Sequence, residues 1–315
     1  MSAWFIALLQ ALLCVALAPL LVGWVRRVKA RLQNRRGAPL LQPYADLHKL
    51  MIKETRVAHT ASPLFRVAPY IVFVAIWLAC ATVPLIALDL PTAGIADIIV
   101  LVGLLALGRF FLALAGMDVG TAFGGMGASR EMLISALAEP ALLMAVFTLA
   151  MTAHSTSLVG VMEHHLTDGF LLRPSYLFAF GALVLVALAE CGRIPVDNPS
   201  THLELTMVHE AMLLEYTGRH LALMEWAAWI KLLLYGVLIV NVFLPWGIAT
   251  VFTPAALALG LIAVVVKLAL LGAALALGET LMAKMRLFRV PGFLNLALLL
   301  GLLGLLSHVI LEVGA

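Results

Sequence analysis

Carboxylates and histidines are concentrated in the stretch ECGRIPVDNPSTHLELTMVHEAMLLEY, which covers residues 190–216. Its most informative acids are Glu190, Asp197, Glu204 and Glu215. The stretch follows an apolar run long enough to cross a bilayer, and an ionisable group beside lipid is costly unless it faces protein or water. These side chains are therefore candidates for handling protons or other ions.

A metal site in the same stretch has little support from the spacing of possible ligands. His209 and Glu210 begin a pattern like HExxH, but position 213 is Leu, so the second histidine is missing. His202 adds no other familiar ligand spacing. The sequence favours proton handling over metal binding, and no metal ligand is assigned.

Further ionisable residues lie inside the apolar runs. Glu139 and Lys267 are several residues from the nearest end of a run, where a charge requires a partner or water. Arg109, Glu225 and Glu279 could instead extend toward lipid headgroups. We assign to ion coupling the residues Glu190, Asp197, Glu204, Glu215, Glu139, Lys267, Lys231, Arg109 and Glu225.

The elements that must position these groups are membrane helices. Hydrophobic residues make up 63% of the chain and charged residues 12%, whereas charged residues are about a quarter of a soluble domain. The apolar runs are continuous and rich in Leu and Ala, which favours helices over the short alternating strands of a β-barrel. The sequence predicts an all-α integral membrane protein with about eight spans, at residues 3–25, 67–88, 97–116, 132–153, 174–190, 223–246, 254–278 and 291–312.

The distribution of Lys and Arg predicts the orientation. The first loop, at about 26–66, is strongly basic, and further basic residues lie in the loops at about 117–131, 191–222 and 279–290. The alternate loops contain only Arg173. By the positive-inside rule the basic loops are cytoplasmic and both termini are outside. Because basic residues follow the first run and none precedes it, we interpret this run as an uncleaved anchor of one polytopic domain, residues 1–315.

Two of these loops carry additional patterns. Residues 44–52 have the apolar spacing of a short amphipathic helix, which could lie on lipid headgroups or dock a soluble partner. The loop GMDVGTAFGGMGASRE is too rich in glycine for a helix interior, so we expect an irregular segment, either a flexible linker or a close-packed wall. We assign to loop structure and partner docking the residues Arg35, Arg36, Gln42, Asp46, Lys49, Lys53, Glu54, Arg130 and Arg193.

Two other classes of function are disfavoured. The net charge of +3 comes from basic residues that topology already explains, and they lack interleaved aromatic residues for stacking on bases, so nucleic-acid binding is set aside. The three cysteines, Cys14, Cys80 and Cys191, are far apart and do not form a cradle for an iron–sulfur cluster. Any electron-carrying cofactor is therefore expected on another subunit.

Three separated motifs occur in the order typical of one known family. They are RRGAPLLQPYADLHKLMIKE, GASRE followed by Glu139, and the acidic stretch that starts at Glu190. On these motifs the chain resembles the NADH dehydrogenase subunit 1 family of respiratory complex I. The segments HLELTMVHEAM and ETLMAKMRLFRVP resemble those of the family's branch in membrane-bound group 4 hydrogenases and formate hydrogenlyase.

The resemblance implies a subunit that is not catalytic alone, in the inner membrane of a prokaryote. It implies partners of four kinds: hydrogenase-like large and small subunits, an iron–sulfur protein and antiporter-like membrane subunits, within surrounding lipid. Iron–sulfur clusters, with or without a Ni–Fe centre, would lie in those partners, and none in this chain. The alternatives are a quinone-chamber subunit of a complex I-like oxidoreductase and, from the residues alone, a stand-alone secondary transporter.

Overall fold

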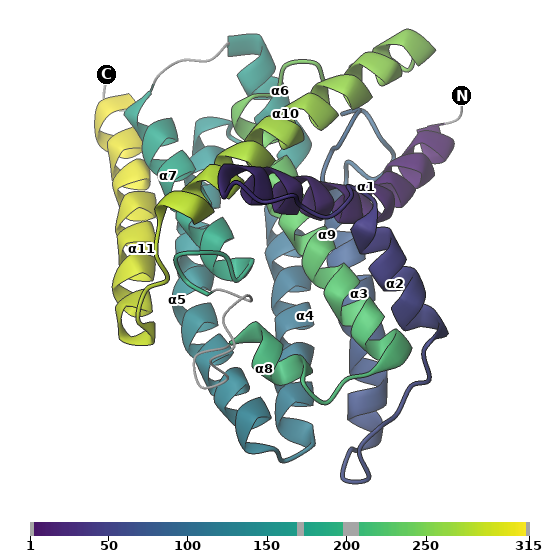
Figure 1. Ribbon diagram of the computed structural model, residues 1–315. Helices are drawn as coiled ribbons and strands as arrows, with labels where there is room; N and C mark the ends of the chain where they lie inside the picture. The colour runs from purple at the N-terminus through teal and green to yellow at the C-terminus, as the bar shows by residue number, and fades with distance from the viewer. Residues whose placement is uncertain (1–2, 169–172, 198–207, 313–315) are drawn as a thin grey trace.

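The structure is a computed structural model that describes residues 3–168, 173–197 and 208–312 (Figure 1). The described residues form helices without a named strand. The helices are α1 (Ala3–Leu32), α2 (Gln42–Ile52), α3 (Pro63–Thr82), α4 (Ile98–Asp118), α5 (Ala122–Thr152), α6 (Leu158–Asp168), α7 (Pro174–Glu190), α8 (His209–Leu213), α9 (Gly218–Phe243), α10 (Pro254–Leu281), η2 (Leu287–Arg289), α11 (Val290–Ser307) and η3 (His308–Glu312).

The predicted fold class is confirmed. Seven described helices are long and apolar enough to cross a membrane, and α7 is a shorter apolar helix at the eighth predicted position. The prediction placed several helix ends wrongly by up to ten residues, and it missed α6, which lies between α5 and α7. The predicted amphipathic helix near residues 44–52 is present as α2.

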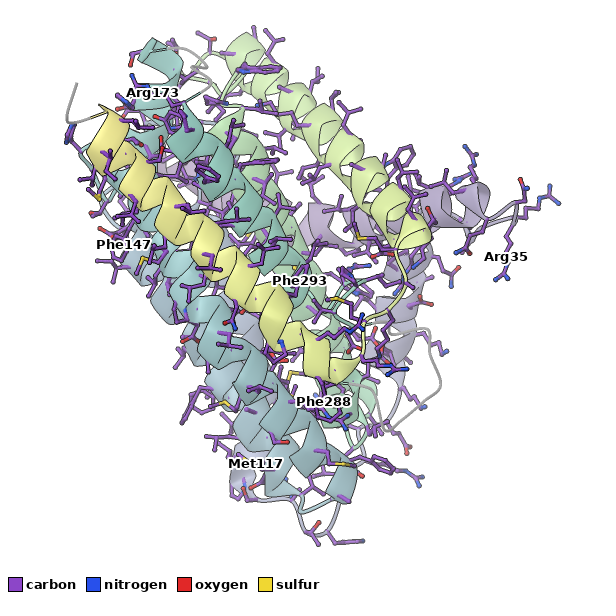
Figure 2. The ribbon with its side chains drawn as sticks, turned by 90° about the vertical axis from the view of Figure 1, so that its left-hand side faces the viewer. Arg35, Met117, Phe147, Arg173, Phe288 and Phe293 are labelled. Carbon is purple, nitrogen blue, oxygen red and sulfur yellow. The ribbon has the colours of Figure 1, made fainter. Side chains whose placement is uncertain are left out.

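The helices pack around α9, which is buried along most of its length. α1 and α10 cross the front of the bundle obliquely in Figure 1, and they pack on each other and on α9. α11 lies against α5 and α7, as Figure 2 shows from the side. α3 and α4 pack together, and α8 fills the space beside α4 and α5. Residues from α4, α5, α7 and α9 therefore share one interior.

The length of α7 decides where the acidic stretch begins. α7 has 17 residues, which at 1.5 Å per residue is about 25 Å, less than the roughly 30 Å of the hydrocarbon core. Its last residue, Glu190, contacts residues near the middle of α4 and α9, namely Arg109 and Lys231. The first carboxylate of the stretch thus lies within the bundle and not at its edge.

The expectation that residues 117–131 form an irregular loop is wrong. α4 continues to Asp118 and α5 begins at Ala122, where the Thr121 side chain caps the helix by accepting a hydrogen bond from the Gly124 amide. A Cβ atom built on Gly124 would lie 2.2 Å from the carbonyl oxygen of Gly116. The glycines let α5 approach α4 and α8 closely, so packing offsets their poor helix propensity. The close-packed wall was the correct alternative.

We expect Gly124→Ala to lower the stability of the protein and Gly125→Ala to leave it unchanged or raise it. The methyl group added at position 124 would collide with the backbone of Gly116, whereas one added at position 125 meets no atom within 4 Å. In an open helical position alanine is favoured over glycine by about 1 kcal/mol. Thermal unfolding of the purified protein in detergent compares the two variants. Equal midpoints for both would contradict the close contact of α4 and α5.

The loop after α2 is fastened to the start of α9. Thr217 accepts a hydrogen bond from the Arg56 amide and donates one to its carbonyl, each at 2.8 Å. Gly218, with φ of 57°, has no room for a Cβ because the carbonyl oxygen of Lys53 would lie 2.7 Å away. α2 itself packs on α1 and α9. The predicted docking loop is therefore a fixed part of the bundle.

Candidate functional site

A chain of charged side chains lies in the interior between α4, α5, α7 and α9. Nη1 of Arg109 is 2.9 Å from Oε1 of Glu190 and 3.1 Å from Oε1 of Glu139. Nζ of Lys231 is 2.8 Å from Oε2 of Glu190. Ser135 accepts a hydrogen bond from Arg109 at 2.7 Å and donates one to Glu139 at 3.1 Å. Residues from four helices thus form one connected network.

Three members of this network are shielded from solvent, whereas the side chain of the fourth, Glu139, is 34% exposed. The side chains of Arg109 and Glu190 are 4% and 2% exposed, and that of Lys231 is 14% exposed. Two further nitrogens of Arg109 are buried without a hydrogen-bond partner among the described residues. Charges in such an environment interact strongly, so adding or removing one proton changes the balance along the whole chain. The expectation that Arg109 extends toward lipid headgroups is wrong, because carboxylates in the interior hold it.

A small polar cavity extends the network toward the acidic stretch. It has a volume of about 40 Å³, and its lining includes Glu131, Glu190, Asp197, His209 and Lys231. That volume and lining suit at least one water molecule, which needs about 10–15 Å³ by the same measure and two to four polar partners. A proton could therefore pass between the Glu190–Lys231 pair and the residues of the stretch through a short hydrogen-bonded path.

His209, the first residue of α8, is neutral at pH 7. Burial, together with the positive charge of Lys231, lowers the pKa of His209 to about 4, although Asp197 acts in the opposite direction. Its Nε2 is buried and has no hydrogen-bond partner among the described residues. A neutral imidazole can accept a proton at one nitrogen and release one from the other, which is the exchange that a proton path requires.

We expect acidification to destabilise the protein through His209. Its pKa is 6.5 unfolded and about 4 folded, so below pH 6.5 the unfolded chain takes up a proton that the folded chain excludes. The contribution to stability is complete above pH 6.5 and is lost as the pH falls toward 4. His209→Gln should reduce the drop in thermal midpoint between pH 7 and pH 5, while exposed His59→Gln should not. An identical drop in both variants would contradict the burial of His209.

Two more ion-pair groups lie beyond the small cavity. Asp197 is 2.8 Å from Nζ of Lys284, and its other oxygen accepts a hydrogen bond from the Val208 amide at 3.1 Å. Glu279, at the end of α10, is 2.7 Å from Nζ of Lys29 and 3.3 Å from Nη1 of Arg193. The Glu279 side chain is 4% exposed, so the expectation that it extends toward headgroups is wrong as well.

A larger polar cavity of about 870 Å³ connects these groups to the surface. It is bounded by the end of α1, residues 191–197, α8 and the first half of α9. Asp197 and His209 line both this cavity and the small one. Glu225 and Glu210 line it from α9 and α8. The arrangement gives solvent access at one end and a buried chain of ion pairs at the other.

The structure unites some of the predicted coupling residues and separates others. Lys267 donates a hydrogen bond to the Leu244 carbonyl and lies 6.0 Å from the centre of the Trp246 ring, and no ion pair joins it to the network within the described ranges. Glu215 lies just beyond α8, which ends at Leu213, and no ion pair joins it to the network within the described residues. Glu204 lies outside the described residues.

The predicted docking residues differ in how far they are exposed. Gln42 donates a hydrogen bond to Asp46 at 2.9 Å, and Arg193 pairs with Glu279. Arg35 and Arg36 are exposed, and Figure 2 shows Arg35 extending away from the bundle. Lys49, Lys53 and Glu54 are exposed and Arg130 is half-buried.

Sequence reasoning missed several participants. Glu131 lies in the segment that was expected to be a loop, and its place on α5 faces it toward the small cavity. The sequence analysis used Lys29 and Lys284 only as loop charges that set the membrane orientation. In the structure each pairs with a buried carboxylate. Tyr235 follows Lys231 by one helical turn and is 1% exposed, with no partner for its hydroxyl among the described residues. Lys231 and Tyr235 are four residues apart on α9 and therefore lie on the same face of that helix, a relation that the sequence alone indicates.

The fold and the network define a class: a multi-pass, all-helical membrane protein with a chain of ion pairs in its interior. A sequence model of the family described as NADH dehydrogenase matches residues 5–309. The chain belongs to that family.

Two relatives from Escherichia coli (strain K12) match nearly the whole chain. The chain is 35% identical to formate hydrogenlyase subunit 4 over 285 residues, which cover 90% of this chain and 92% of that protein. It is 36% identical to hydrogenase-4 component C over 281 residues, which cover 89% and 88%. These matches confirm the predicted family and support a membrane subunit of a respiratory-type energy-converting complex, with partners in that complex.

The fold also matches a chain in the structure of the membrane-bound sulfane sulfur reductase, an archaeal respiratory membrane complex. The TM-score is 0.81, and the match covers 97% of this chain and 99% of the other. The sequence identity is 20%, so this likeness bears on the arrangement of helices alone.

Proposed function

We propose that this chain is the membrane-anchor and ion-coupling subunit of a group 4 energy-converting hydrogenase or formate hydrogenlyase. In this role it docks soluble redox subunits and links their electron transfer to movement of protons or sodium ions. The observation that carries the proposal is the connected network of Glu139, Arg109, Glu190 and Lys231, reached from a polar cavity of about 870 Å³. The likeness to two hydrogenase-type subunits supports the choice of complex.

The network is suited to transmit an electrostatic change. Each carboxylate has a cation within 3.1 Å, and Arg109 is shared between Glu139 and Glu190. A charge that appears at the large cavity changes the interaction energy of the Lys231–Glu190 pair. The Glu190–Arg109 and Arg109–Glu139 pairs then change as well, because they share Glu190 and Arg109. A redox event in a docked subunit could thus alter proton affinity inside the bundle. The membrane subunits that receive this change would lie beside Glu139 on α5.

The proposed partners follow from the same role. Hydrogenase-like large and small subunits and an iron–sulfur protein would bind at the end of the bundle that carries α2 and α8, and antiporter-like subunits would bind within the membrane. The electron carriers, iron–sulfur clusters with or without nickel, would belong to the soluble partners. We place this end on the cytoplasmic side of a prokaryotic inner membrane because it carries the basic loops.

Mass spectrometry and metal analysis of the gently solubilised complex test the proposal. We expect this chain to co-purify with iron–sulfur subunits and with a hydrogenase-like large subunit. Purification as a monomer that transports a solute unaided would contradict it and would favour a secondary transporter.

Charge reversal at Arg35 and Arg36 should release the soluble subunits from the membrane while this chain stays inserted. Both side chains are exposed and line the edge of the large cavity, so they can contact a partner without supporting the fold. Arg56→Glu is the control, since Arg56 is 86% exposed in the same loop but does not line that cavity. Sedimentation of membranes followed by immunoblotting measures the release. Full retention of the soluble subunits in the double variant would show that this surface does not dock them.

The size of the large cavity also permits a second candidate function, a quinone chamber. Its volume of about 870 Å³ lies in the range of small-molecule sites, and Tyr216 and His209 offer polar contacts. Electron transfer from the soluble subunits to an added quinone would support this alternative. Evolution of hydrogen by the same complex without quinone reduction would support the hydrogenase role.

A further inference from the structure

A second, apolar cavity lies between α1, α7, α9 and α10. Its volume is about 300 Å³, and the side chains along its length are aliphatic or aromatic, among them Leu21, Phe180, Val184 and Leu271. Phe180, one of the lining residues, is 41% exposed, so the cavity reaches the surface of the bundle beside α7. A Cβ atom built on Gly278, another lining residue, would meet no atom within 4 Å. The groove therefore has room for a chain of methylene groups.

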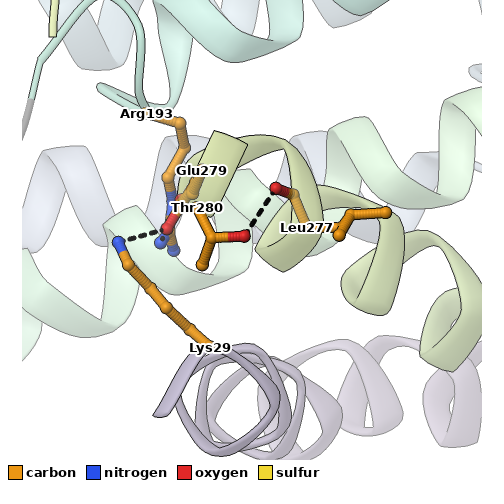
Figure 3. Close-up of polar contacts among 5 residues, drawn as sticks. All are labelled: Lys29, Arg193, Leu277, Glu279 and Thr280. Carbon is orange, nitrogen blue, oxygen red and sulfur yellow. Dashed lines mark hydrogen bonds and ion pairs between the residues drawn. The ribbon is translucent and has the colours of Figure 1, made fainter. Parts of the chain in front are cut away.

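One end of this groove opens beside a basic pocket. The pocket has a volume of about 480 Å³ and is lined by Lys29, Arg35 and Lys284 with a single carboxylate, Glu279. Ile194, Glu279 and Met282 line both the groove and the pocket. Figure 3 shows Lys29 and Arg193 approaching Glu279 from different sides, so one carboxylate is shared by two cations. Lys284 is neutralised by Asp197, but Lys29, Arg193 and Arg35 share Glu279 as the one remaining carboxylate, so positive charge is in excess at this end of the groove.

We propose that the groove and the basic pocket together bind one anionic phospholipid. One of its two acyl chains lies along α9 and α10 in the groove, and the phosphate lies in the pocket near Lys29 and Arg35. Basic pockets between membrane helices bind anionic headgroups, and the groove replaces the acyl chain's contacts with neighbouring lipids by van der Waals contacts with its aliphatic lining. The hydroxyl of Tyr235, which lines the groove and has no partner among the described residues, can donate a hydrogen bond to a polar atom of the lipid.

Charge selects this occupant over the other amphiphiles of a membrane. A zwitterionic lipid gains less from the pocket because its own cation would face three basic side chains. A quinone has no anionic group for the pocket to neutralise. The pocket shares Lys29, Arg35 and Glu279 with the large cavity. None of the four residues of the network around Arg109 lines the groove or the pocket, and lipid retention is measured without ion transport.

Lipid retention by the purified complex tests the proposal. The complex is stripped with detergent, incubated with equal amounts of phosphatidylglycerol and phosphatidylcholine, and analysed by native mass spectrometry. We expect one phosphatidylglycerol per copy of this chain. Gly278→Leu should abolish its retention by filling the groove, whereas Gly103→Leu should not, since Gly103 is exposed on α4 and also faces open space. Lys29→Gln should lower the preference for phosphatidylglycerol by about fivefold, while Arg193 still neutralises Glu279.

A measurement on the unmodified complex covers the case in which a variant fails to fold. A photoreactive phosphatidylglycerol should label peptides from residues 184–194 and 271–282. Equal retention of both lipids, retention in Gly278→Leu, labelling only outside these segments, or a quinone in place of phospholipid would each overturn the proposal.

Discussion

Arg109→Leu is expected to leave little folded protein in the membrane. Arg109 is the shared partner of Glu139 and Glu190, and its side chain is 4% exposed. Removing one partner of a buried ion pair costs about 3–5 kcal/mol because the remaining charge stays buried. This is a large part of the stability of a typical protein. The yield and thermal midpoint of the extracted protein measure the loss.

The double variant Arg109→Leu with Glu139→Leu separates charge from packing. It removes a cation and a carboxylate together and leaves the Glu190–Lys231 pair, whose atoms are 2.8 Å apart, in place. Replacing a buried pair by apolar residues is often neutral for stability, and Glu139 is only half-buried, at 34% exposure, so we expect most of the folded protein to return. Ion transport should not return, because the network is cut at Arg109. A single variant as stable as the natural protein would contradict the buried pairing.

Glu190→Gln is expected to lower stability, because Lys231 loses its carboxylate partner while Arg109 keeps Glu139, and to reduce ion transport per assembled complex by about tenfold or more. Glutamine keeps the size and one carbonyl acceptor of the glutamate, so the contacts with Arg109 and Lys231 can persist in part. The titratable charge that joins these two cations is absent. Ion uptake by vesicles that contain the purified complex, driven by the electron donor of the soluble subunits, measures the effect.

One control and two further variants accompany the Glu190 measurement. Glu163→Gln changes an exposed acid on α6, where an ion pair contributes only about 0–1 kcal/mol, so transport should be retained. Glu204→Gln and Glu215→Gln extend the test to the other predicted carboxylates. Full transport and turnover in Glu190→Gln would reduce the acidic stretch to a structural or docking role.

The membrane helices could be predicted because their cause is local. An apolar run of about 20 residues has few alternatives to a helix in lipid, and the predicted runs recur as α1, α3, α4, α5, α7, α9, α10 and α11. The start of α5 could not be predicted in this way. Its glycines are unfavourable by propensity, and only the close approach to Gly116 and Met212 explains why they are helical.

The candidate site was predictable in its members but not in its connections. Glu190, Glu139 and Lys231 drew attention because a charge in or beside an apolar run needs a partner. The structure supplies Arg109 to both carboxylates and Glu190 to Lys231. The partnership depends on the shortness of α7 and on which helix faces meet, which are tertiary facts. Lys267 met the same sequence criterion and instead binds the Leu244 carbonyl. Position in a run indicates that a charge needs a partner, and packing decides which one.

The central claim is that the buried network responds to the redox state of docked subunits. The most direct measurement is the reduced-minus-oxidised infrared difference spectrum of the reconstituted complex. We predict a carboxyl signal that is present in the natural protein and in Glu163→Gln and absent from Glu190→Gln. The same spectrum in all three would show that Glu190 does not respond to electron transfer and would contradict the account.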